Sequence, residues 1–459
     1  MVAQLREIVG KDYVLVDDDS LRRFASDETE DLCYYPEVAV RPRTPDEVSQ
    51  ILSWCTRHRI PVTPRGAGTG LSGGALPVFG GVVLVMDRFN EILEIDERNF
   101  QATVEPGVIN QVFQEAVAAK GLYYPPDPAS KGSCFFFWYM AESSGGPHAV
   151  KYGITRDYVL NLEVVLPTGE VIWTGANVLK NSTGYNLTQL IVGSEGTLGV
   201  ITKIRLKLIP MPSRTMLMFV PFASAEKACE AVAAVFRKGI TPSALEFMER
   251  DAVLCGMAYD EKIRVEVGEA EAFLLIEVDG HDDQVMFGEC EQISSVMQAF
   301  EAGEILFADT EAQKESLWYM RRKVAEAVKH VSVYKEEDTV VPRAELPALL
   351  MGVKEIGRKY GFRSVCYGHA GDGNLHVNIL KEEMSDDAWN NDLPKGIREI
   401  FQLTVHLGGT LSGEHGIGLV QKNYMDIPFS KVHLGLMRGI KQLFDPAGIL
   451  NPGKIFPDN

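Results

Sequence analysis

The chain has 459 residues and a formal net charge of −18 at pH 7. This length predicts two or three domains, each able to bury its own core. The acidic balance argues against a nucleic-acid partner, because no basic stretch is present to neutralise phosphates. No run approaches the roughly 18 apolar residues of a membrane-spanning helix. The N-terminus also lacks the pattern of a secretion signal, so we expect a cytoplasmic protein.

The seven cysteines are scattered, and no two of them form a CxxC pair. This pattern excludes an obvious iron–sulfur or structural zinc site and is typical of reduced thiols in a cytosol. If electrons leave the protein through iron–sulfur clusters, another chain must carry those clusters.

Residues 1–58 predict a helix, an extended piece and a second helix. Thr44 is the expected N-cap of the second helix, with Pro45 at its first position and Glu47 placed for a capping box. The apolar positions then recur at helical spacing and predict the buried face: Val48, Ile51, Leu52 and Cys55.

A glycine-rich loop at residues 66–74 follows a short apolar strand. Such a loop can turn backbone N–H groups inward as an anion nest, and Arg65 adds positive charge, so a pyrophosphate is the expected ligand. A Rossmann fingerprint is excluded because its third glycine position holds Leu71. The alternative is a purely structural turn. Further strands are expected at 81–86 and 92–104.

Residues 125–153 contain six bulky residues in a row, Phe135 to Met140, which by pattern alone predict a buried strand. Strands are also expected at 162–166 and 171–173. The stretch 190–202 then places a glycine at every third position, at 193, 196 and 199. The structural alternative for this stretch is a strand-to-helix turn.

The segment Pro210-Met211-Pro212 marks a domain boundary. After it, long helices alternate with strands, which predicts an α+β substrate domain. Helices are expected at 223–237, 282–300 and 311–330, and a strand at 272–278.

Two histidines, His369 and His376, flank a turn-forming run of glycine and Asx residues at 371–374. This spacing can fold both imidazoles toward one point. Glu414 and His415 stand side by side in a second glycine-flanked segment. Two histidines and a carboxylate suit a divalent metal with open positions. The alternative is a pair of structural histidines.

Four motifs, at 64–74, 190–202, 367–378 and 412–418, resemble the flavin-dependent D-2-hydroxy acid dehydrogenases. That group includes D-lactate dehydrogenases, the flavoprotein subunit of glycolate oxidase and D-2-hydroxyglutarate dehydrogenase, all related in fold to vanillyl-alcohol oxidase. The resemblance implies an α+β fold with a two-part FAD-binding domain at 1–210 and a substrate-binding cap domain at 211–420. A C-terminal segment, 421–459, would return to the FAD-binding domain.

The resemblance also implies the site residues. Arg321 and Lys335 would hold the substrate carboxylate, Asn378 would contact the substrate, and His415 would take the hydroxyl proton. Zinc, or manganese or iron, would bind His369, His376 and Glu414. FAD would contact the following residues: Pro64, Arg65, Gly66, Ala67, Gly68, Thr69, Gly70, Ser72, Gly73, Pro126, Asp127, Ser133, Gly145, Gly153, Glu195, Gly199, Ile201 and Asn451.

The implied reaction is oxidation of a small D-2-hydroxy acid, of the D-lactate, glycolate or D-2-hydroxyglutarate class, to the 2-oxo acid, with hydride passing to flavin N5. No nicotinamide fingerprint is present. The expected electron acceptor is therefore an electron-transferring flavoprotein, an iron–sulfur subunit, a quinone or a cytochrome. Such a partner could hold the protein at a membrane surface, and a homodimer is compatible with the sequence.

One stretch departs from the family pattern. Relatives usually carry Gly-Gly-Asn between Cys134 and Ala141, where this chain has Phe137, Trp138 and Tyr139. Glycines beside a cofactor serve close backbone approach. The alternative function is therefore a flavin-poor or flavin-free subunit or binding module that keeps the fold. A second enzymatic alternative is an oxidase that passes electrons to oxygen.

Overall fold

The computed structural model describes residues 1–128, 130 and 132–458. The chain forms two compact units, and each is described by itself. The first unit contains residues 1–145, 154–211 and 414–459, and the second contains residues 146–153 and 212–413. The sequence-based division placed its boundaries at 210/211 and 420/421, and it did not separate the short segment 146–153 from its neighbours.

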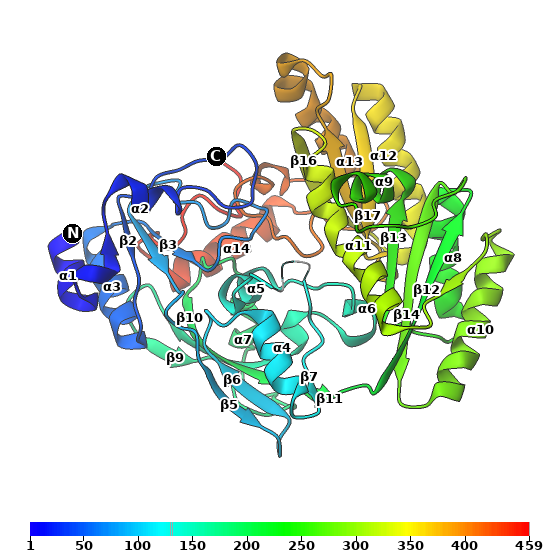
Figure 1. Cartoon of the computed structure of the whole chain (residues 1–459). Helices are drawn as coiled ribbons and strands as arrows, with labels where there is room; N and C mark the ends of the chain where they lie inside the picture. Colours follow the sequence, from blue (N-terminus) through cyan, green and yellow to red (C-terminus); the bar gives the residue numbers. More distant parts are fainter. Residues whose placement is uncertain (129, 131, 459) are drawn as a thin grey trace. The chain divides into compact units, whose positions relative to one another are not determined.

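The first unit contains a four-stranded sheet in the order β1-β2-β4-β3, formed by Val14–Leu15, Val38–Val40, Val82–Val85 and Val62–Arg65; Figure 1 labels β2 and β3. Strands β2, β4 and β3 run parallel. The helices before and within this sheet are α1 (Val2–Val9), α2 (Asp18–Arg22) and α3 (Pro45–His58). Strand β4 (Val82–Val85) confirms the strand expected at 81–86.

Helix α3 begins as its sequence predicts. Thr44 is the N-cap and accepts a hydrogen bond from the Glu47 backbone N–H, and Pro45 occupies the first turn. The Glu47 carboxylate accepts from the backbone N–H of Arg43, at 2.6 Å, so it caps one residue earlier than a capping box would. The predicted apolar face is confirmed, since all four of its residues are buried.

A five-stranded antiparallel sheet follows in the order β5-β6-β10-β8-β9, formed by Ile92–Asp96, Gln101–Val104, Val200–Lys207, Val159–Val165 and Val171–Trp173. The single strand predicted over 92–104 is wrong, because the chain turns between β5 and β6. Asp96 stabilises this turn by accepting from the backbone N–H groups of Arg98 and Asn99, at 3.1 and 3.0 Å. Asx side chains commonly cap turns in this way.

The remaining elements of the first unit are short apart from its last helix. They are β7 (Leu122–Tyr123), which pairs with β11 (Ile209–Pro210), and the helices α4 (Asn110–Ala118), α5 (Phe136–Glu142), α7 (Leu187–Ile191) and α14 (Lys431–Phe444). The glycines at 193, 196 and 199 lie between α7 and β10, so the chain there passes from helix to strand rather than from strand to helix.

The aromatic run forms helix α5, so the prediction of a buried strand there is wrong. The Phe136 ring packs against Phe113 and Tyr124, with centroid distances of 5.3 and 5.7 Å. Phe137 is also buried, and its backbone N–H donates to the carbonyl of Pro106. When every residue of a run is apolar, its periodicity cannot distinguish a strand from a short buried helix.

The second unit is built on one seven-stranded antiparallel sheet in the order β15-β12-β14-β13-β17-β18-β16. Its strands are Leu306–Phe307, Arg214–Phe222, Ala272–Gly280, Ala244–Glu249, Arg363–Gly368, Asn374–Leu380 and Tyr334–Val340. Its helices are α6 (Ala149–Tyr152), α8 (Ala225–Arg237), α9 (Arg250–Tyr259), α10 (Asp283–Ala299), α11 (Glu311–Lys329), α12 (Leu346–Tyr360) and α13 (Leu393–His406). The helices and the strand predicted for this region are confirmed.

The two faces of this sheet carry different helices (Figure 1). Helices α8 and α10 contact β14, while α12 contacts β17 and α13 contacts β16. The other face packs against α9 and α11 through an apolar core that includes Phe273, Leu275, Met320 and Val324. Because side chains alternate along a strand, each strand contributes every second residue to this second face. No helix among the described residues is both long and apolar enough to cross a membrane.

Candidate functional site

The functional residues of the second unit gather at one end of the sheet face that carries α9 and α11. The strand register places Asp338 and Tyr367 on either side of His376, and Glu336 opposite Asn378. Directly opposed residues point to the same face of a sheet. The resulting polar face consists of Glu246, Glu336, Asp338, Tyr367, Asn374, His376 and Asn378, together with His369 just beyond β17.

His369 is held by a buried carboxylate that the sequence did not indicate. Its Nδ1 lies 2.9 Å from both oxygens of Glu246, which is on β13. The same carboxylate lies 2.6 Å from Nη2 of Arg321 on α11. Burial alone would raise the pKa of Glu246, but the charges of His369 and Arg321 outweigh burial and lower it. Glu246 therefore remains an anion between two nitrogen groups.

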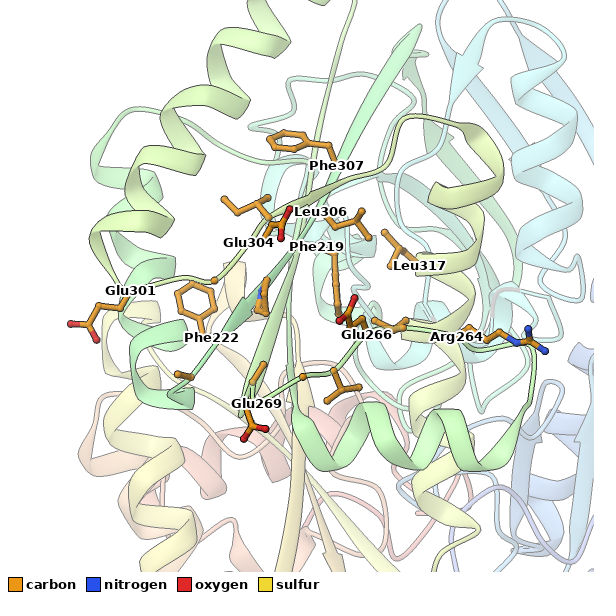
Figure 2. Close-up of a pocket in the computed structure, with 18 of the residues that line it drawn as sticks. Phe219, Phe222, Arg264, Glu266, Glu269, Glu301, Glu304, Leu306, Phe307 and Leu317 are labelled. Atoms are coloured by element: carbon orange, nitrogen blue, oxygen red, sulfur yellow. The ribbon is translucent and has the colours of Figure 1, made fainter.

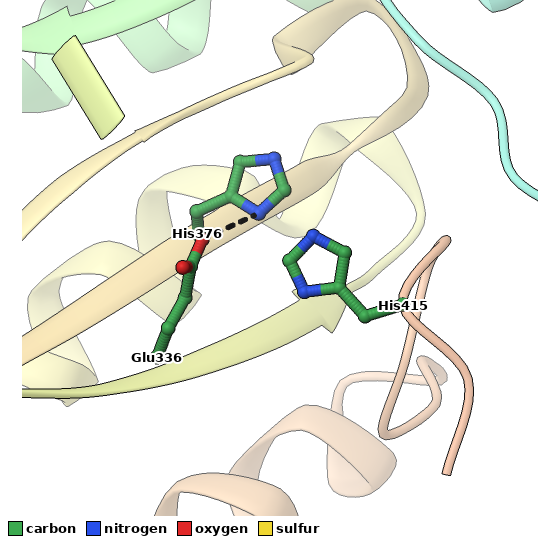
Figure 3. Close-up of side chains that lie close together, drawn as sticks. All are labelled: Glu336, His376 and His415. Carbon is green, nitrogen blue, oxygen red and sulfur yellow. Dashed lines mark ion pairs between the residues drawn. The ribbon is translucent and has the colours of Figure 1, made fainter. Parts of the chain in front are cut away.

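His376 lies among further carboxylates of the polar face. Its Nδ1 is 3.6 Å from Oε1 of Glu336 and 3.6 Å from Oδ1 of Asp338; Figure 3 draws the contact with Glu336 as a dashed line. The rings of His369 and His376 are 5.5 Å apart and nearly perpendicular. A separation of 3.6 Å is too long for a hydrogen bond. It is close to the spacing of two ligand atoms that share a metal ion at about 2 Å.

Asp338 and Glu336 differ in the hydrogen bonds that their carboxylate oxygens accept. Asp338 accepts from the side-chain amide of Asn374 at 2.7 Å and from the hydroxyl of Ser412 and the backbone N–H of Gly413, both at 2.9 Å. Asp338 therefore has a structural role that fixes residues 412–413. The buried Oε2 of Glu336 has no hydrogen-bond partner among the described residues. Glu336 is the second site residue that the sequence reasoning missed.

The structure does not bring Lys335 together with Arg321, contrary to the sequence-based prediction. Lys335 pairs with Ile379, so its exposed side chain lies on the opposite sheet face, with Nζ 6.0 Å from the ring of Trp389. Arg321 lies on the polar face, where its guanidinium is 5.3 Å from the Tyr367 ring. Neighbouring residues of a strand point to opposite faces, so an offset of one position decides which side chain reaches the site.

Several polar atoms of this region are buried without a hydrogen-bond partner among the described residues. They are Nε and Nη2 of Arg321, the hydroxyl of Tyr367, Oε2 of Glu336, Oδ1 of Asn374, and both Oδ1 and Nδ2 of Asn378. Two of these atoms take part in ion pairs that lie outside hydrogen-bond geometry: Nη2 of Arg321 with Glu246 at 2.6 Å, and Oε2 of Glu336 with Lys329 at 3.7 Å. Each of the other atoms, which has neither a hydrogen bond nor an ion pair, leaves an unsatisfied group that costs about 1–3 kcal/mol. Burial raises the pKa of Tyr367 well above its usual value, so its hydroxyl stays protonated and can donate.

In the first unit, the predicted cofactor segments pack against one another. The buried carboxylate of Glu195 accepts from the backbone N–H groups of Ile417 and Gly418, at 2.8 and 2.7 Å. Asn451 donates to the carbonyls of Gly74 and Glu195, at 3.0 and 2.8 Å. A Cβ atom on Gly418 would lie 2.1 Å from the carbonyl oxygen of Ser72, so only glycine fits there. Segments far apart in sequence thus meet around the glycine-rich loop.

Arg65 tests whether this loop suits an anionic cofactor. Its guanidinium is buried, and Nη2 donates to the carbonyls of Ser26 and Arg23, at 2.8 and 3.3 Å. Its Nη1 has no hydrogen-bond partner among the described residues; burial lowers the pKa of Arg65, and the charge of nearby Asp27 partly opposes this. A Cβ atom on Gly68 would lie 2.2 Å from Nη2, so the loop backbone passes close to the charge. A buried cation with an unused donor beside a glycine loop fits a pyrophosphate.

The other predicted cofactor residues differ in their surroundings. Pro126, Asp127 and Ile201 are buried, whereas Ser133 is exposed and Gly153 lies in the second unit. A Cβ atom on Gly199 would meet Val164 at 2.4 Å, which gives that glycine a packing reason. The predicted residues Pro64, Gly66, Gly70 and Gly73 are buried, while Ala67 and Thr69 are half-buried.

The predicted pair Glu414–His415 belongs to the first unit. There the backbone N–H of Gly145 donates to the Glu414 carboxylate at 3.3 Å. The peptide bond from Gly413 to Glu414 joins the two units, and Gly413 is bound to Asp338 in the second unit.

The short segment 146–153 contributes a second buried acid cluster to the second unit. His148 Nε2 lies 3.1 Å from Glu277, which also accepts from the hydroxyl of Ser243 and the indole N–H of Trp318, at 2.8 and 3.0 Å. His148 pulls the pKa of Glu277 below its usual value, against the effect of burial, which alone would raise it.

A surface pocket of about 800 Å³ lies elsewhere on the second unit, around β15 and residues 264–270 (Figure 2). Its floor is apolar, with Phe219, Phe222 and Leu317, and its wall carries Glu266, Glu269 and Glu304. None of the predicted site residues lines it. Its acidic wall would repel an anionic substrate.

Comparison with known proteins agrees with a chain of two domains. Residues 36–175 match the family described as FAD binding domain, and residues 211–455 match FAD linked oxidases, C-terminal domain. The chain is 39% identical to glycolate oxidase subunit GlcD of Bacillus subtilis, covering 99% of this chain and 96% of that protein. It is 37% identical to a D-lactate dehydrogenase of Anaerostipes hadrus, covering 99% and 97%. It is 31% identical to D-2-hydroxyglutarate dehydrogenase of Stutzerimonas stutzeri, covering 99% and 98%. The solved structure of p-cresol methylhydroxylase matches at a TM-score of 0.82 and 20% identity, covering 100% of this chain and 96% of that chain, which shows the fold.

Proposed function

The chain belongs to the FAD-linked oxidases, and from that premise we propose that it oxidises a small D-2-hydroxy acid to the 2-oxo acid. The candidate substrates are of the glycolate, D-lactate and D-2-hydroxyglutarate classes, after the activities for which its relatives are named. FAD, when bound, supplies the acceptor for the hydride from the substrate carbon. The glycine-rich loop and Arg65 would hold its pyrophosphate.

The observation that carries this proposal is the set of buried polar atoms, on and beside the polar face, that form no hydrogen bond with the described residues. Nη2 of the Arg321 guanidinium already lies 2.6 Å from Glu246, and the neighbouring Nε is buried without a hydrogen-bond partner among the described residues, so Nε is the donor left for a substrate carboxylate. Asn378 has no exposed surface, and its amide atoms lie near the Tyr367 hydroxyl but form no hydrogen bond of good geometry with a described residue. Buried groups of this kind are normally satisfied, so a small polar ligand is the simplest explanation.

A divalent metal fits the same region. Two imidazoles and a carboxylate suit zinc, manganese or iron, and His369, His376 and Glu414 would be its ligands. The covalent link supports Glu414, because Gly413 is bound to Asp338, which lies opposite His376 in the sheet. Glu336 offers a further carboxylate oxygen near His376. Bound there, the ion would supply Lewis-acid polarisation of the substrate hydroxyl.

The chain's own residues would then divide the work. Arg321 and Asn378 orient the acid by its carboxylate and neighbouring oxygen. His415, which follows Glu414, accepts the hydroxyl proton, a role suited to imidazole near neutral pH. Lys335 has no part in this proposal because of its position on the other sheet face. With no nicotinamide fingerprint, the electrons would pass to an external acceptor, either a redox protein or a quinone.

Anaerobic mixing of the flavin-loaded protein with each acid tests the proposal. We expect the visible flavin band to bleach with a D-2-hydroxy acid or glycolate, and to persist with L-lactate. A flavin band that persists with all three substrate classes would exclude this reaction.

A further inference from the structure

Glu246 stands out among the buried acids because it contacts both proposed binding groups. Its side chain, in the middle of β13, has no exposed surface. One oxygen lies 2.6 Å from Nη2 of Arg321, and both oxygens lie 2.9 Å from Nδ1 of His369. Arg321 and His369 come from a helix and from the end of another strand. Glu246 is therefore the common neighbour of the carboxylate-binding arginine and of one proposed metal ligand.

The two contacts impose different constraints. An imidazole that donates from Nδ1 to a carboxylate is fixed in one tautomer, with Nε2 left as the ligand atom. A buried guanidinium needs an anion nearby, because a buried cation without a counter-ion is strongly disfavoured. Arg321 has only 6% of its side chain exposed. One negative charge thus serves both groups.

We propose that Glu246 is a positioning residue shared by His369 and Arg321: it orients the His369 imidazole toward the metal and supplies the counter-ion of the buried Arg321 guanidinium. This inference rests on the proposed function. Glu246 touches neither the substrate nor the metal itself, and acts through the two side chains that do.

Glu277 provides a matched control on the same sheet face. Glu277 is on β14, directly opposite Ala244 of β13. It is therefore a diagonal neighbour of Glu246, which is also on β13. It is buried, it is bound to a histidine, His148, and it contacts α11 through Trp318, one helical turn before Arg321. Loss of its charge should disturb folding to a similar degree. Its histidine, however, belongs to the segment 146–153 and not to the proposed metal site.

The experiment compares Glu246→Gln, Glu246→Asp and Glu277→Gln with the wild-type protein in full length and with flavin bound. Calorimetric titration of chelator-treated protein with Zn²⁺ measures the metal site. We expect Glu246→Gln to weaken Zn²⁺ binding by about 10- to 100-fold, as for other residues that orient a ligand histidine. Glu246→Asp keeps the charge and should recover part of this loss. Glu277→Gln should stay within about twofold of wild type.

Titration of the metal-free proteins with pyruvate measures carboxylate binding at Arg321 separately from metal binding. Glu246→Gln leaves Arg321 without its counter-ion, so pyruvate should bind as tightly as to wild type or more tightly. Turnover should nevertheless fall at least tenfold, because the His369 imidazole is no longer oriented toward the metal. A residue that only supports the fold would weaken pyruvate binding and turnover together.

The outcomes separate the two proposals. Unchanged Zn²⁺ affinity in Glu246→Gln, equal losses in Glu246→Gln and Glu277→Gln, or weaker pyruvate binding in Glu246→Gln would each overturn the role of Glu246. A wild-type protein that binds neither Zn²⁺ nor pyruvate would instead overturn the proposed function on which that role rests.

Discussion

The polar face of the second unit and the aromatic run of the first unit are both buried. They differ in how many of their buried polar atoms form no hydrogen bond with the described residues. On and beside the polar face, Arg321, Tyr367 and Asn378 carry buried donors or acceptors without hydrogen-bond partners among the described residues. In the aromatic run, Phe136 and Phe137 are packed and have no polar side-chain atoms, and the buried Tyr139 hydroxyl is the atom there without a hydrogen-bond partner among the described residues. Unsatisfied polar atoms point to a missing ligand, whereas packed rings account for their own burial.

The largest expected effect comes from removing a proposed metal ligand of the polar face. His369→Ala or Glu414→Ala should abolish metal content and turnover together. Loss of several kcal/mol of charge stabilisation corresponds to roughly a thousandfold in rate. The fold should remain intact, and His148→Ala is the control, since His148 also pairs with a buried glutamate. Metal analysis beside kinetics checks this, and full activity after complete chelation would contradict it.

A smaller effect is expected from Arg321→Lys. An ammonium group cannot reproduce the planar fork of a guanidinium, so KM should rise and kcat should fall, by about tenfold or more in combination. Arg322→Lys, one position along the same helix, should change little. Steady-state kinetics with glycolate, D-lactate and D-2-hydroxyglutarate measure both constants. Wild-type values with all three acids would place the carboxylate site elsewhere.

The aromatic run allows the opposite test, because there a change should restore a ligand rather than remove one. If Phe137, Trp138 and Tyr139 displace backbone that normally approaches the flavin, overpacking of about 1–3 kcal/mol weakens FAD binding by roughly 10- to 100-fold. Replacing them with Gly, Gly and Asn should then raise FAD affinity and activity together. Titration of apo protein with FAD compares both forms.

A packed ring has its own cost of removal, and this provides the control. Phe136→Ala should destabilise the first unit by about 3–5 kcal/mol, measured by denaturant unfolding, without a gain in FAD affinity. Equal FAD affinity in the triple variant and the original chain would show that the aromatic run is accommodated beside the cofactor.

The smallest effect concerns Lys335, which shares a strand with Glu336 but faces the other side of the sheet. We expect Lys335→Ala to change kcat/KM by less than about twofold, as for an exposed side chain away from a site. Glu336→Gln should have the larger effect, because its carboxylate lies beside His376. The reverse order in a kinetic comparison would show that the strand register is not as described.

The sequence predicted local structure well wherever one residue pattern had one physical solution. Helix α3 is an example, since the N-cap Thr44, the first-turn Pro45 and the apolar spacing all agree. The histidines His369 and His376 were also predicted to converge, because a glycine-rich turn and a strand return the chain. Their rings do lie 5.5 Å apart.

The predictions that failed, and the residues that were not predicted, share a different cause. Strand register and strand pairing cannot be read from residues that are close in sequence. Glu246 lies 123 positions from His369 in the chain, and nothing in its own neighbourhood marks it. Glu336 and Lys335 are adjacent, and only the pairing of β16 with β18 decides which one reaches the polar face. The aromatic run could not be assigned to strand or helix, because every position in it is apolar.

The first unit is discontinuous, and this has a consequence for how the protein is made. Asn451 bonds to Gly74 and to Glu195, across 377 and 256 positions of the chain. A ribosome adds about 5–20 residues per second, so the glycine-rich loop must wait for tens of seconds before the segment that secures it has emerged. During that interval the whole second unit, residues 146–153 and 212–413, is synthesised and free to fold. The N-terminal part of the first unit therefore cannot complete its packing until the last segment, 414–459, has been made.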